Sequence, residues 1–341
     1  MKIMLTADPE IPVPPVYYGG IERIISFLAN ELTLLGHTVT LLAHKDSHTL
    51  AHLIPYKGLT SNGLYDTLYN TAMLTHAYFT QKPDVIHSFG KLSYMSLLLP
   101  MQVPKIMSYQ REPTLRGINI AAKLSKNGTL YFTGCSNYIT QKIMPVADAN
   151  TIYNGVEIDK YTYSSSVNAD APLVFLGRIE EIKGPHHAIQ IAKLSNKKLI
   201  LAGNLPNEAK HSVFFEAYIK PYLNTDIQYI GAVNDTQKNE LLGQALAFLM
   251  PITWNEPFGI VMAEALACGT PIIGFPQGAV SEVVEHGVNG FLAHDVAEAS
   301  KYINSISQIS RAACRQIAEN KYSSKVITSE YVMLYQKMLN K

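Results

Sequence analysis

Short apolar runs alternate with amphipathic stretches through the first half of the chain. Runs rich in β-branched and other apolar residues predict strands at residues 2–7, 38–43, 84–89, 104–109 and 130–135. Between the first two runs, apolar residues recur at helical spacing from Ile21 to Leu35, and Gly36 is typical of a helix C-terminus. Ser136 follows the fifth run and is expected to cap the next helix. This alternation predicts a parallel sheet covered by helices on both faces.

The second half repeats the alternation after a polar stretch at residues 163–171, whose composition is typical of a linker. A last strand of the first half is expected around residues 151–156. Further strands are predicted at residues 173–177, 198–202, 227–231, 247–252 and 271–275, with helices at 235–245 and 258–267. A final helix at residues 329–339 is expected to cross back onto the first half.

A chain of 341 residues is too long for one ordinary core and predicts two domains. We expect an N-terminal domain at residues 1–155, completed by a C-terminal helix near residues 327–341, and a C-terminal domain at residues 156–326. Doubly wound folds bind ligands at the carboxyl ends of their strands. The two domains are therefore expected to face a central cleft that holds the ligand.

The composition argues against several classes of function. A net charge of +1 and a pI near 7.7 lack the basic footprint of a nucleic-acid-binding protein. No apolar stretch is long enough to span a bilayer, and the apolar N-terminal run is too short for a signal peptide, so we expect a cytoplasmic protein. Cys135, Cys268 and Cys314 are odd in number and widely spaced, which indicates reduced packing residues.

One segment departs from the neutral balance of charge. Residues 105–126 carry five basic residues and one acidic residue. A solvated face explains such a run, and contact with a phosphorylated acceptor or an anionic membrane surface is the functional alternative. Peripheral membrane contact therefore stays open.

Residues 254–271 carry the most informative pattern in the chain. Pro257 suits the first turn of a helix and Gly269 suits its end, which places Glu256 just before the helix and Glu264 two turns inside it. Eight residues of helix rise by roughly 12 Å, whereas the two carboxylates of a glycoside hydrolase stand about 5–9.5 Å apart. The two glutamates are therefore expected to anchor different parts of one elongated ligand.

The same helix offers a second signal and an alternative reading. Backbone N–H groups near Phe258 and Gly259 are expected to form an anion site suited to a diphosphate. A carboxylate accepts two hydrogen bonds from a vicinal diol, so one glutamate on a ribose and the other on a sugar fits the chemistry. Alternatively, Glu256 only favours the helix N-terminus and Glu264 lies on a solvated face.

This segment resembles the Glu-x7-Glu signature of the retaining glycosyltransferases of family 4. The resemblance continues along the chain in the order expected of the family, through Tyr18-Gly19-Gly20-Ile21-Glu22-Arg23, Asp84-Val85-Ile86-His87, Asn154-Gly155-Val156, Gly177-Arg178, Lys183-Gly184, Gly203-Asn204 and Gly287-Val288-Asn289-Gly290-Phe291. It implies the GT-B fold, with two doubly wound Rossmann-like α/β domains facing a central cleft. The C-terminal domain would bind the nucleotide sugar and the N-terminal domain the acceptor.

The resemblance also implies roles for individual residues. Glu256 would bind hydroxyls of the donor sugar, Glu264 the ribose, and Arg178 with Lys183 the diphosphate. A guanidinium and an ammonium at a strand end can neutralise a leaving diphosphate without a metal ion, so no metal or cofactor is expected. The alternative is that these two cations lie at the surface and form ion pairs with Glu180 and Glu181. The candidate catalytic residues are Glu256, His87, Arg178 and Lys183, and the candidate donor-binding residues are Gly19, Gly20, Arg178, Lys183, Val233, Glu256, Phe258, Gly259 and Glu264.

Two candidates belong to the first domain. His87 closes an apolar strand and is expected to point into the cleft; the resemblance implies contact with the donor sugar, and a satisfied core histidine is the alternative. Gly19-Gly20 lies between the first strand and the first helix, where backbone can approach phosphate. The dinucleotide spacing of glycines is missing, which argues against a nicotinamide dehydrogenase. Glu22 and Arg23 are expected to be exposed helix charges.

The acceptor side departs from the family. Relatives often carry a histidine-rich segment after the next strand, whereas this chain has residues 108–113, with Tyr109 and Arg111 as candidate acceptor-binding residues. The predicted activity is metal-independent, retaining transfer of a hexose from a nucleotide sugar, with UDP-glucose favoured, to an unidentified acceptor hydroxyl. A GT-B nucleotide-sugar epimerase and a non-catalytic nucleotide-sugar-binding or scaffold protein are the alternatives.

Overall fold

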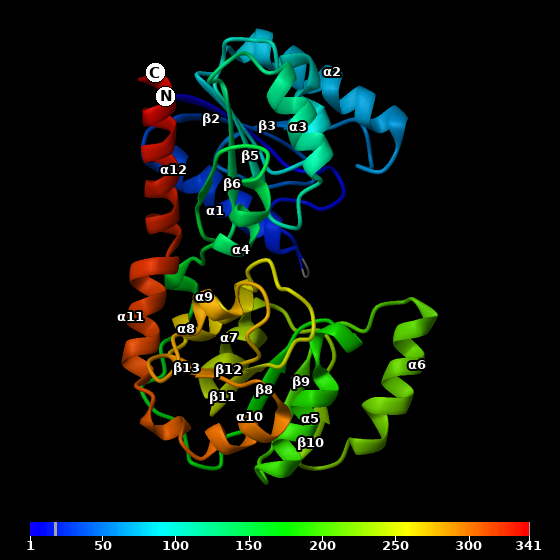
Figure 1. Cartoon of the computed structure of the whole chain (residues 1–341), viewed down its shortest axis with the longest axis vertical. Helices are drawn as coiled ribbons and strands as arrows, with labels where there is room; N and C mark the ends of the chain where they lie inside the picture. The colour runs from blue at the N-terminus through cyan, green and yellow to red at the C-terminus, as the bar shows by residue number, and fades with distance from the viewer. Residues whose placement is uncertain (17–18, 341) are drawn as a thin grey trace. The chain divides into compact units, whose positions relative to one another are not determined.

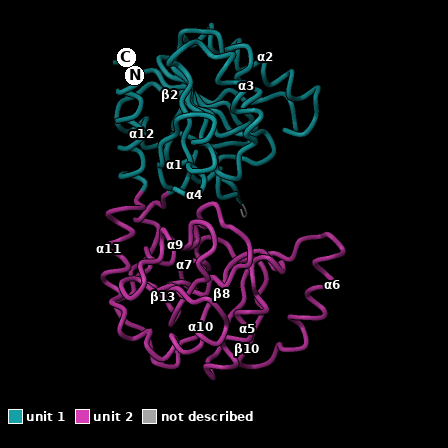
Figure 2. Tube along the Cα trace, viewed as in Figure 1, with its two compact units in different colours: residues 1–154, 324–341 teal, residues 155–323 magenta. Residues whose placement is uncertain are grey.

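The chain forms two compact units in a computed structural model that describes residues 1–16 and 19–340. Unit 1 comprises residues 1–154 and 324–341, and unit 2 comprises residues 155–323 (Figure 2). Each unit is a layered α/β fold built on a parallel sheet (Figure 1). Tyr18, part of the first motif above, lies outside the described residues.

The sheet of unit 1 has seven parallel strands in the order β3-β2-β1-β4-β5-β6-β7. The strands are β1 (Lys2–Thr6), β2 (Thr38–Ala43), β3 (His52–Pro55), β4 (Val85–Ser88), β5 (Lys105–Tyr109), β6 (Leu130–Gly134) and β7 (Ala149–Thr151). The chain winds outward from β1 to β3 and then returns to β4 on the other side of β1. The carboxyl ends of β1 and β4 therefore form a topological switch point, where such sheets bind ligands.

The sheet of unit 2 has six parallel strands in the order β10-β9-β8-β11-β12-β13. The strands are β8 (Leu173–Leu176), β9 (Leu199–Ala202), β10 (Ile227–Tyr229), β11 (Ala247–Met250), β12 (Ile272–Gly274) and β13 (Gly290–Leu292). The switch point of this unit lies between β8 and β11. The expectation of doubly wound, parallel α/β domains is confirmed.

Helices cover both sheets (Figure 1). Unit 1 contains α1 (Gly20–Leu34), α2 (Leu64–Gln81), α3 (Leu115–Leu124), α4 (Asn137–Ile143) and α12 (Ser324–Leu339). Unit 2 contains α5 (Pro185–Leu194), α6 (Ala209–Tyr218), α7 (Asp235–Gln244), α8 (Ile260–Ala267), α9 (Val280–Val283), α10 (Val296–Ile303) and α11 (Arg311–Tyr322). In the part of the chain that the structure describes, no helix combines the length and apolar character needed to cross a bilayer.

Two sequence expectations about helices of unit 1 are confirmed. Ser136 caps α4 by accepting a hydrogen bond from the backbone N–H of Ile139 at 3.2 Å. The C-terminal helix α12 packs against α1, and the hydroxyl of Ser324 donates to the carboxylate of Glu31 at 3.1 Å. The last segment of the chain therefore completes the fold that the first segment begins.

Two other expectations need correction. The polar residues 163–171 belong to unit 2, where the backbone N–H of Ser164 donates to the carbonyl of Cys268 at 3.1 Å. Lys105 is fully buried and does not join the basic surface of its segment. Its ammonium donates to the carbonyls of Met101 and Val103 at 2.8 and 2.7 Å, and burial lowers its pKa to about 8. Local composition does not reveal such tertiary partners.

The core of unit 2 is organised by the buried side chain of Arg311, which extends from α11. Its guanidinium donates to the carbonyls of Gly243 and Ala245 at the end of α7, both at 2.9 Å. It also donates to the carbonyl of Ser164 at 2.7 Å and the hydroxyl of Thr270 at 2.9 Å. One side chain thus satisfies acceptors from three segments of the unit.

We expect Arg311→Met to lower the free energy of unfolding of unit 2 by about 3 kcal/mol, because several buried carbonyls lose their donor at once. Urea denaturation followed by circular dichroism measures this loss. The control is Arg116→Met on the exposed face of α3, which we expect to change stability by less than about 0.5 kcal/mol. An equally stable Arg311 variant would contradict the role of this side chain.

Candidate functional site

The loops that follow β8 and β11 meet at the switch point of unit 2. The backbone N–H of Thr253 donates to the carbonyl of Ile182 at 3.0 Å and joins the two loops. Gly184 has a φ of 75°, and a Cβ atom on it would lie 1.9 Å from the carbonyl oxygen of Pro251. Only glycine fits this close approach, which holds the neighbouring Lys183 beside the second loop.

Lys183 and Glu256 form an ion pair across these loops. The Lys183 ammonium lies 2.7 Å from Oε2 of Glu256, and the indole N–H of Trp254 donates to the same oxygen at 3.1 Å. The ammonium also lies 4.5 Å from the centre of the Trp254 ring, within the range of a cation–π interaction. The side chains of Lys183 and Glu256 are 16% and 11% exposed, so the pair lies largely out of solvent.

Arg178 follows β8 in the first of these loops, as the sequence predicted. Its guanidinium Nη1 lies 2.6 Å from Oε1 of the buried Glu180. The alternative that Arg178 and Lys183 form ion pairs with Glu180 and Glu181 is therefore half right. Arg178 pairs with Glu180, whereas Lys183 pairs with Glu256 instead of Glu181. The Arg178 side chain is 35% exposed and remains accessible at the strand end.

The start of α8 differs from the prediction. Gly259 is the N-cap, with a left-handed φ of 75°, and the helix begins at Ile260, so Pro257 and Phe258 precede it. Phe258 is buried and packs edge-on against Tyr322 at 5.7 Å. Because the helix is shorter than expected, the helical rise of eight residues does not describe the separation of the two glutamates. The glutamates instead lie in separate local environments.

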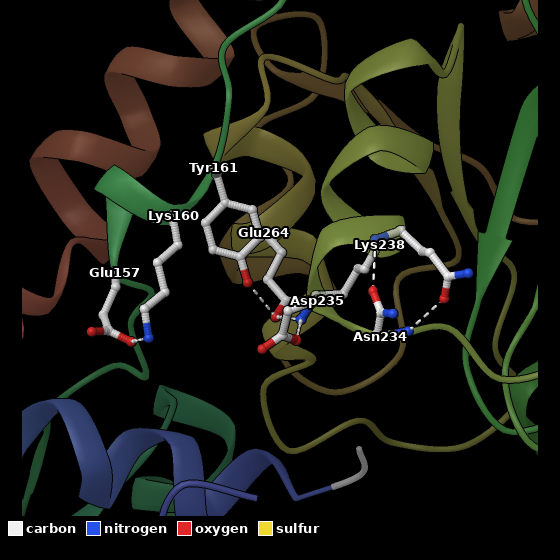
Figure 3. Close-up of polar contacts among 8 residues, drawn as sticks. Glu157, Lys160, Tyr161, Asn234, Asp235, Lys238 and Glu264 are labelled. Carbon is white, nitrogen blue, oxygen red and sulfur yellow. Dashed lines mark hydrogen bonds and ion pairs between the residues drawn. The ribbon is translucent and has the colours of Figure 1, made fainter. Parts of the chain in front are cut away.

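Glu264 points from α8 toward α7 and is buried (Figure 3). Its Oε1 accepts the hydroxyl of Tyr161 at 2.7 Å and lies 2.5 Å from the ammonium of Lys238. Lys238 also lies 3.3 Å from the carboxylate of Asp235 (Figure 3). The alternative that placed Glu264 on a solvated face is therefore wrong.

Tyr161 and Lys238 were not singled out in the sequence, yet both hold Glu264. Lys238 lies in the first turns of α7, after a capping box between Asn234 and Gln237 (Figure 3). The sequence analysis placed this helix at residues 235–245, but local pattern did not reveal which side chain the lysine meets. Val233, a candidate donor-binding residue, is half-buried directly before this cap.

Arg315 fixes the position of Tyr161 and α8 together. Its Nη1 donates to the carbonyl of Tyr161 at 2.8 Å and to the carbonyl of Ala267, the last residue of α8, at 2.7 Å. The helix that carries Glu264 and the chain segment that carries its tyrosine partner are thereby tied to α11.

Unit 1 contains a cavity of about 310 Å³ at its own switch point. The candidates Tyr109 and Arg111 line it, together with Asp8 after β1 and Lys91 after β4. The backbone N–H of Lys91 donates to Asp8 at 3.1 Å, and the Arg111 guanidinium lies 3.5 Å from the same carboxylate. Burial and the nearby Glu10 raise the pKa of Asp8. Burial raises the pKa of Tyr109 to about 12.

A buried carboxylate lies where the sequence predicted a phosphate contact at Gly19-Gly20. Glu22 in the first turn of α1 is buried instead of exposed, and a Cβ atom on Gly19 would lie 2.8 Å from its Oε2. Burial raises the pKa of Glu22, and its own backbone N–H bonds to the carboxylate and opposes that rise. An internal carboxylate therefore occupies the N-terminus of α1, where a phosphate was expected.

The expected position of His87 is wrong. Its ring is fully buried, with Nδ1 2.7 Å from the hydroxyl of Tyr335 and Nε2 2.6 Å from the hydroxyl of Ser108. Tyr335 belongs to α12, which covers this strand. Burial lowers the pKa of His87 to about 3, so the ring is neutral at pH 7. His87 is a satisfied core histidine of unit 1.

Comparison with known proteins agrees with the fold and with the family that the motifs resemble. A model of the family described as Glycosyl transferases group 1 matches residues 164–324, and a model of Glycosyltransferase Family 4 matches residues 18–160. The chain is 24% identical to the spore coat protein SA of Bacillus subtilis, with 97% of this chain and 96% of that protein covered.

Solved structures are similar over the whole chain. A sucrose-phosphate synthase from Thermosynechococcus elongatus has a TM-score of 0.80 at 17% identity, with 99% of each chain covered. The HepE protein of Anabaena in complex with UDP and glucose has a TM-score of 0.77 at 19% identity, with 98% of this chain and 99% of that chain covered. These structures share the GT-B fold.

The burial of His87 predicts an acid-sensitive unit 1. Its folded pKa lies below the unfolded value of about 6.5, so the folded state binds fewer protons, and its contribution is present above pH 6.5 and lost as pH falls toward 3. We expect the stability advantage of wild type over His87→Gln to shrink by up to about 1.4 kcal/mol per pH unit below pH 6.5.

Urea denaturation at pH 7.5, 6 and 5 measures this difference. The control is His76→Gln on the exposed face of α2, where the substitution removes no buried side chain. A constant difference between wild type and His87→Gln over this range would contradict the account.

Proposed function

This chain belongs to the family 4 glycosyltransferases, and on that premise we propose that it transfers a hexose from a nucleotide sugar to an acceptor hydroxyl, with retention of configuration and without a metal ion. Unit 2 is proposed to bind the donor, and unit 1 the acceptor. The observation that carries the proposal is the pair of cations, Arg178 and Lys183, in the loop after β8 at the switch point of unit 2.

Arg178 and Lys183 suit a diphosphate. A guanidinium and an ammonium make charge-assisted hydrogen bonds to phosphate oxygens and stabilise the charge that develops on a departing diphosphate. Glu180 and Glu256 hold these cations in place in the structure. The cations are therefore already in position before a diphosphate binds. A diphosphate would compete with these carboxylates for them.

The two glutamates suit the neutral parts of the donor. Both contacts of Glu256 use Oε2, and both contacts of Glu264 use Oε1. The second oxygen of each carboxylate would accept hydroxyl hydrogens, from the donor sugar at Glu256 and from the ribose at Glu264. Val233, Phe258 and Gly259 complete the proposed donor site through the segments before α7 and α8.

The proposed reaction exchanges one bond at the anomeric carbon. The bond to the phosphate oxygen breaks, and a bond to the acceptor oxygen forms on the same face of the sugar. The acceptor proton passes to the departing phosphate oxygen, so the nucleoside diphosphate leaves with the bonding electrons. Arg178 and Lys183 would lower the barrier by stabilising that leaving group.

UDP-glucose is the proposed donor. The HepE protein, which shares the fold, was solved with UDP and glucose. In unit 1, Tyr109 and Arg111 border the cavity and are the proposed acceptor-binding residues.

Lys183→Met should weaken the binding of UDP by about 10- to 100-fold, since a charge-assisted hydrogen bond contributes roughly 1.5–3 kcal/mol. The loss also leaves Glu256 without its ammonium beside the diphosphate. Lys183→Met with Glu256→Gln should recover part of the affinity, because the repulsive charge is removed. Isothermal titration calorimetry with UDP, GDP and ADP measures these affinities and ranks the bases.

Lys220→Met is the matched control, because Lys220 lies on the surface of unit 2. Its ion pair with Glu216 is exposed to solvent, and such surface pairs contribute little. The UDP affinity of this variant should equal that of the wild type. Unchanged UDP affinity in Lys183→Met would refute the proposed donor site. Interconversion of the sugar of UDP-glucose without any acceptor would contradict transfer and identify an epimerase instead.

A further inference from the structure

Gln110 stands out among the residues that line the cavity of unit 1. Its Nε2 and Oε1 are both shielded from solvent, and neither has a hydrogen-bond partner among residues 1–16 and 19–340. A buried amide without partners costs on the order of 1–3 kcal/mol in stability. Such a group beside a cavity is explained when a bound molecule supplies the missing hydrogen bonds.

The cavity lies where the topology predicts a ligand. Asp8 follows β1, and Phe89 and Lys91 follow β4, so these residues stand at the carboxyl ends of the two strands that form the switch point. Gln110 follows β5, the next strand of the sheet. The ligand of unit 1 would therefore be held by loops from three neighbouring strands.

The charges around the cavity disfavour a phosphorylated ligand. Asp8 and Glu112 balance Lys91 and Arg111 among the charged residues that line it. Burial is the main cause that raises the pKa of Asp8, the carboxylate of Glu10 adds to the rise, and Arg111 opposes it. The carboxylates of Asp8, Glu10 and Glu112 place negative charge beside the cavity. A bound dianion would meet this negative charge at close range.

The amide itself indicates the chemistry of the ligand. Gln110 offers two N–H donors and one carbonyl acceptor. A phosphate oxygen only accepts and would leave the amide carbonyl without a partner. A hydroxyl group both donates and accepts, so adjacent hydroxyls can satisfy the amide and also donate to the Asp8 carboxylate.

We propose that Gln110 and Asp8 form an acceptor subsite that binds adjacent hydroxyls of a neutral sugar or cyclitol ring. The inference rests on the proposed function, because it names the class of acceptor for that reaction. The cavity volume of about 310 Å³ lies at the lower end of small-molecule pockets, about 300–1,000 Å³, and suits one ring. Tyr109 and Phe89 supply apolar surface for the carbon face of that ring.

Saturation-transfer NMR on the full chain tests this subsite. The probes are glucose, galactose, mannose, N-acetylglucosamine and myo-inositol, with glucose 6-phosphate as the anionic comparison, each measured with and without UDP. The variant is Gln110→Met, which keeps the size of the side chain and removes both hydrogen-bonding atoms. Gln102→Met, at an exposed glutamine of unit 1, is the matched control.

At least one neutral probe should bind the wild type and the control, and should bind Gln110→Met about tenfold more weakly, as the loss of hydrogen bonds worth roughly 1.4 kcal/mol predicts. UDP affinity should stay unchanged in the variant, and the melting temperature should not fall, because methionine removes an unpaired buried amide. These two readouts separate a lost subsite from a misfolded unit. Asp8→Asn should weaken the same probe, since the amide accepts more weakly than the carboxylate.

Three results would overturn the subsite: no neutral probe binds, all probes bind Gln110→Met as they bind the wild type, or glucose 6-phosphate binds more tightly than glucose through Gln110. Failure of the wild type to bind UDP would contradict the proposed function instead. Neutral-ring binding that depends on Gln110 would support the subsite in either case.

Discussion

The reversal of strand order in each sheet is the constraint on which the candidate sites depend. In unit 2, the order β9-β8-β11-β12 brings the ends of β8 and β11 together, although more than seventy residues of chain separate them. The loops from these strands carry Lys183 and Glu256, which meet as an ion pair at 2.7 Å. In unit 1, the same reversal places the ends of β1 and β4 at the cavity.

Two lysine–glutamate ion pairs fix the candidate carboxylates of unit 2 in the same way. Lys183 holds Glu256 in the loop before α8, and Lys238 holds Glu264 inside that helix. Breaking a buried ion pair leaves an uncompensated charge, so each lysine fixes the position of its carboxylate. Arg315 adds a backbone tie between α8 and the Tyr161 segment. A donor would thus meet carboxylates and cations that are already oriented.

Much of the fold follows from local pattern, whereas side-chain environments do not. Apolar runs and helical spacing located α1 and most of the parallel strands, but not β3 at the edge of its sheet. Ser136 was readable as a cap because capping depends on neighbours within one turn. For His87 the alternative of a satisfied core histidine proved correct, and the sequence could not decide for it because its partner Tyr335 lies 248 residues later. The start of α8 was misplaced because Pro257 is typical of a first turn, while the left-handed φ of Gly259 delays the helix. The partners of Glu264 and the unpaired amide of Gln110 depend on tertiary packing that no periodicity encodes.

The fluorescence of Trp254 during a titration with UDP tests the central claim most directly, since it is the only tryptophan of the chain and touches both members of the Lys183–Glu256 pair. If a diphosphate draws the ammonium of Lys183 away from Glu256, the charge beside the indole changes. The account predicts a saturable change in emission that follows the binding isotherm and disappears in Lys183→Met. Emission that stays constant while calorimetry shows UDP bound to the wild type would contradict it.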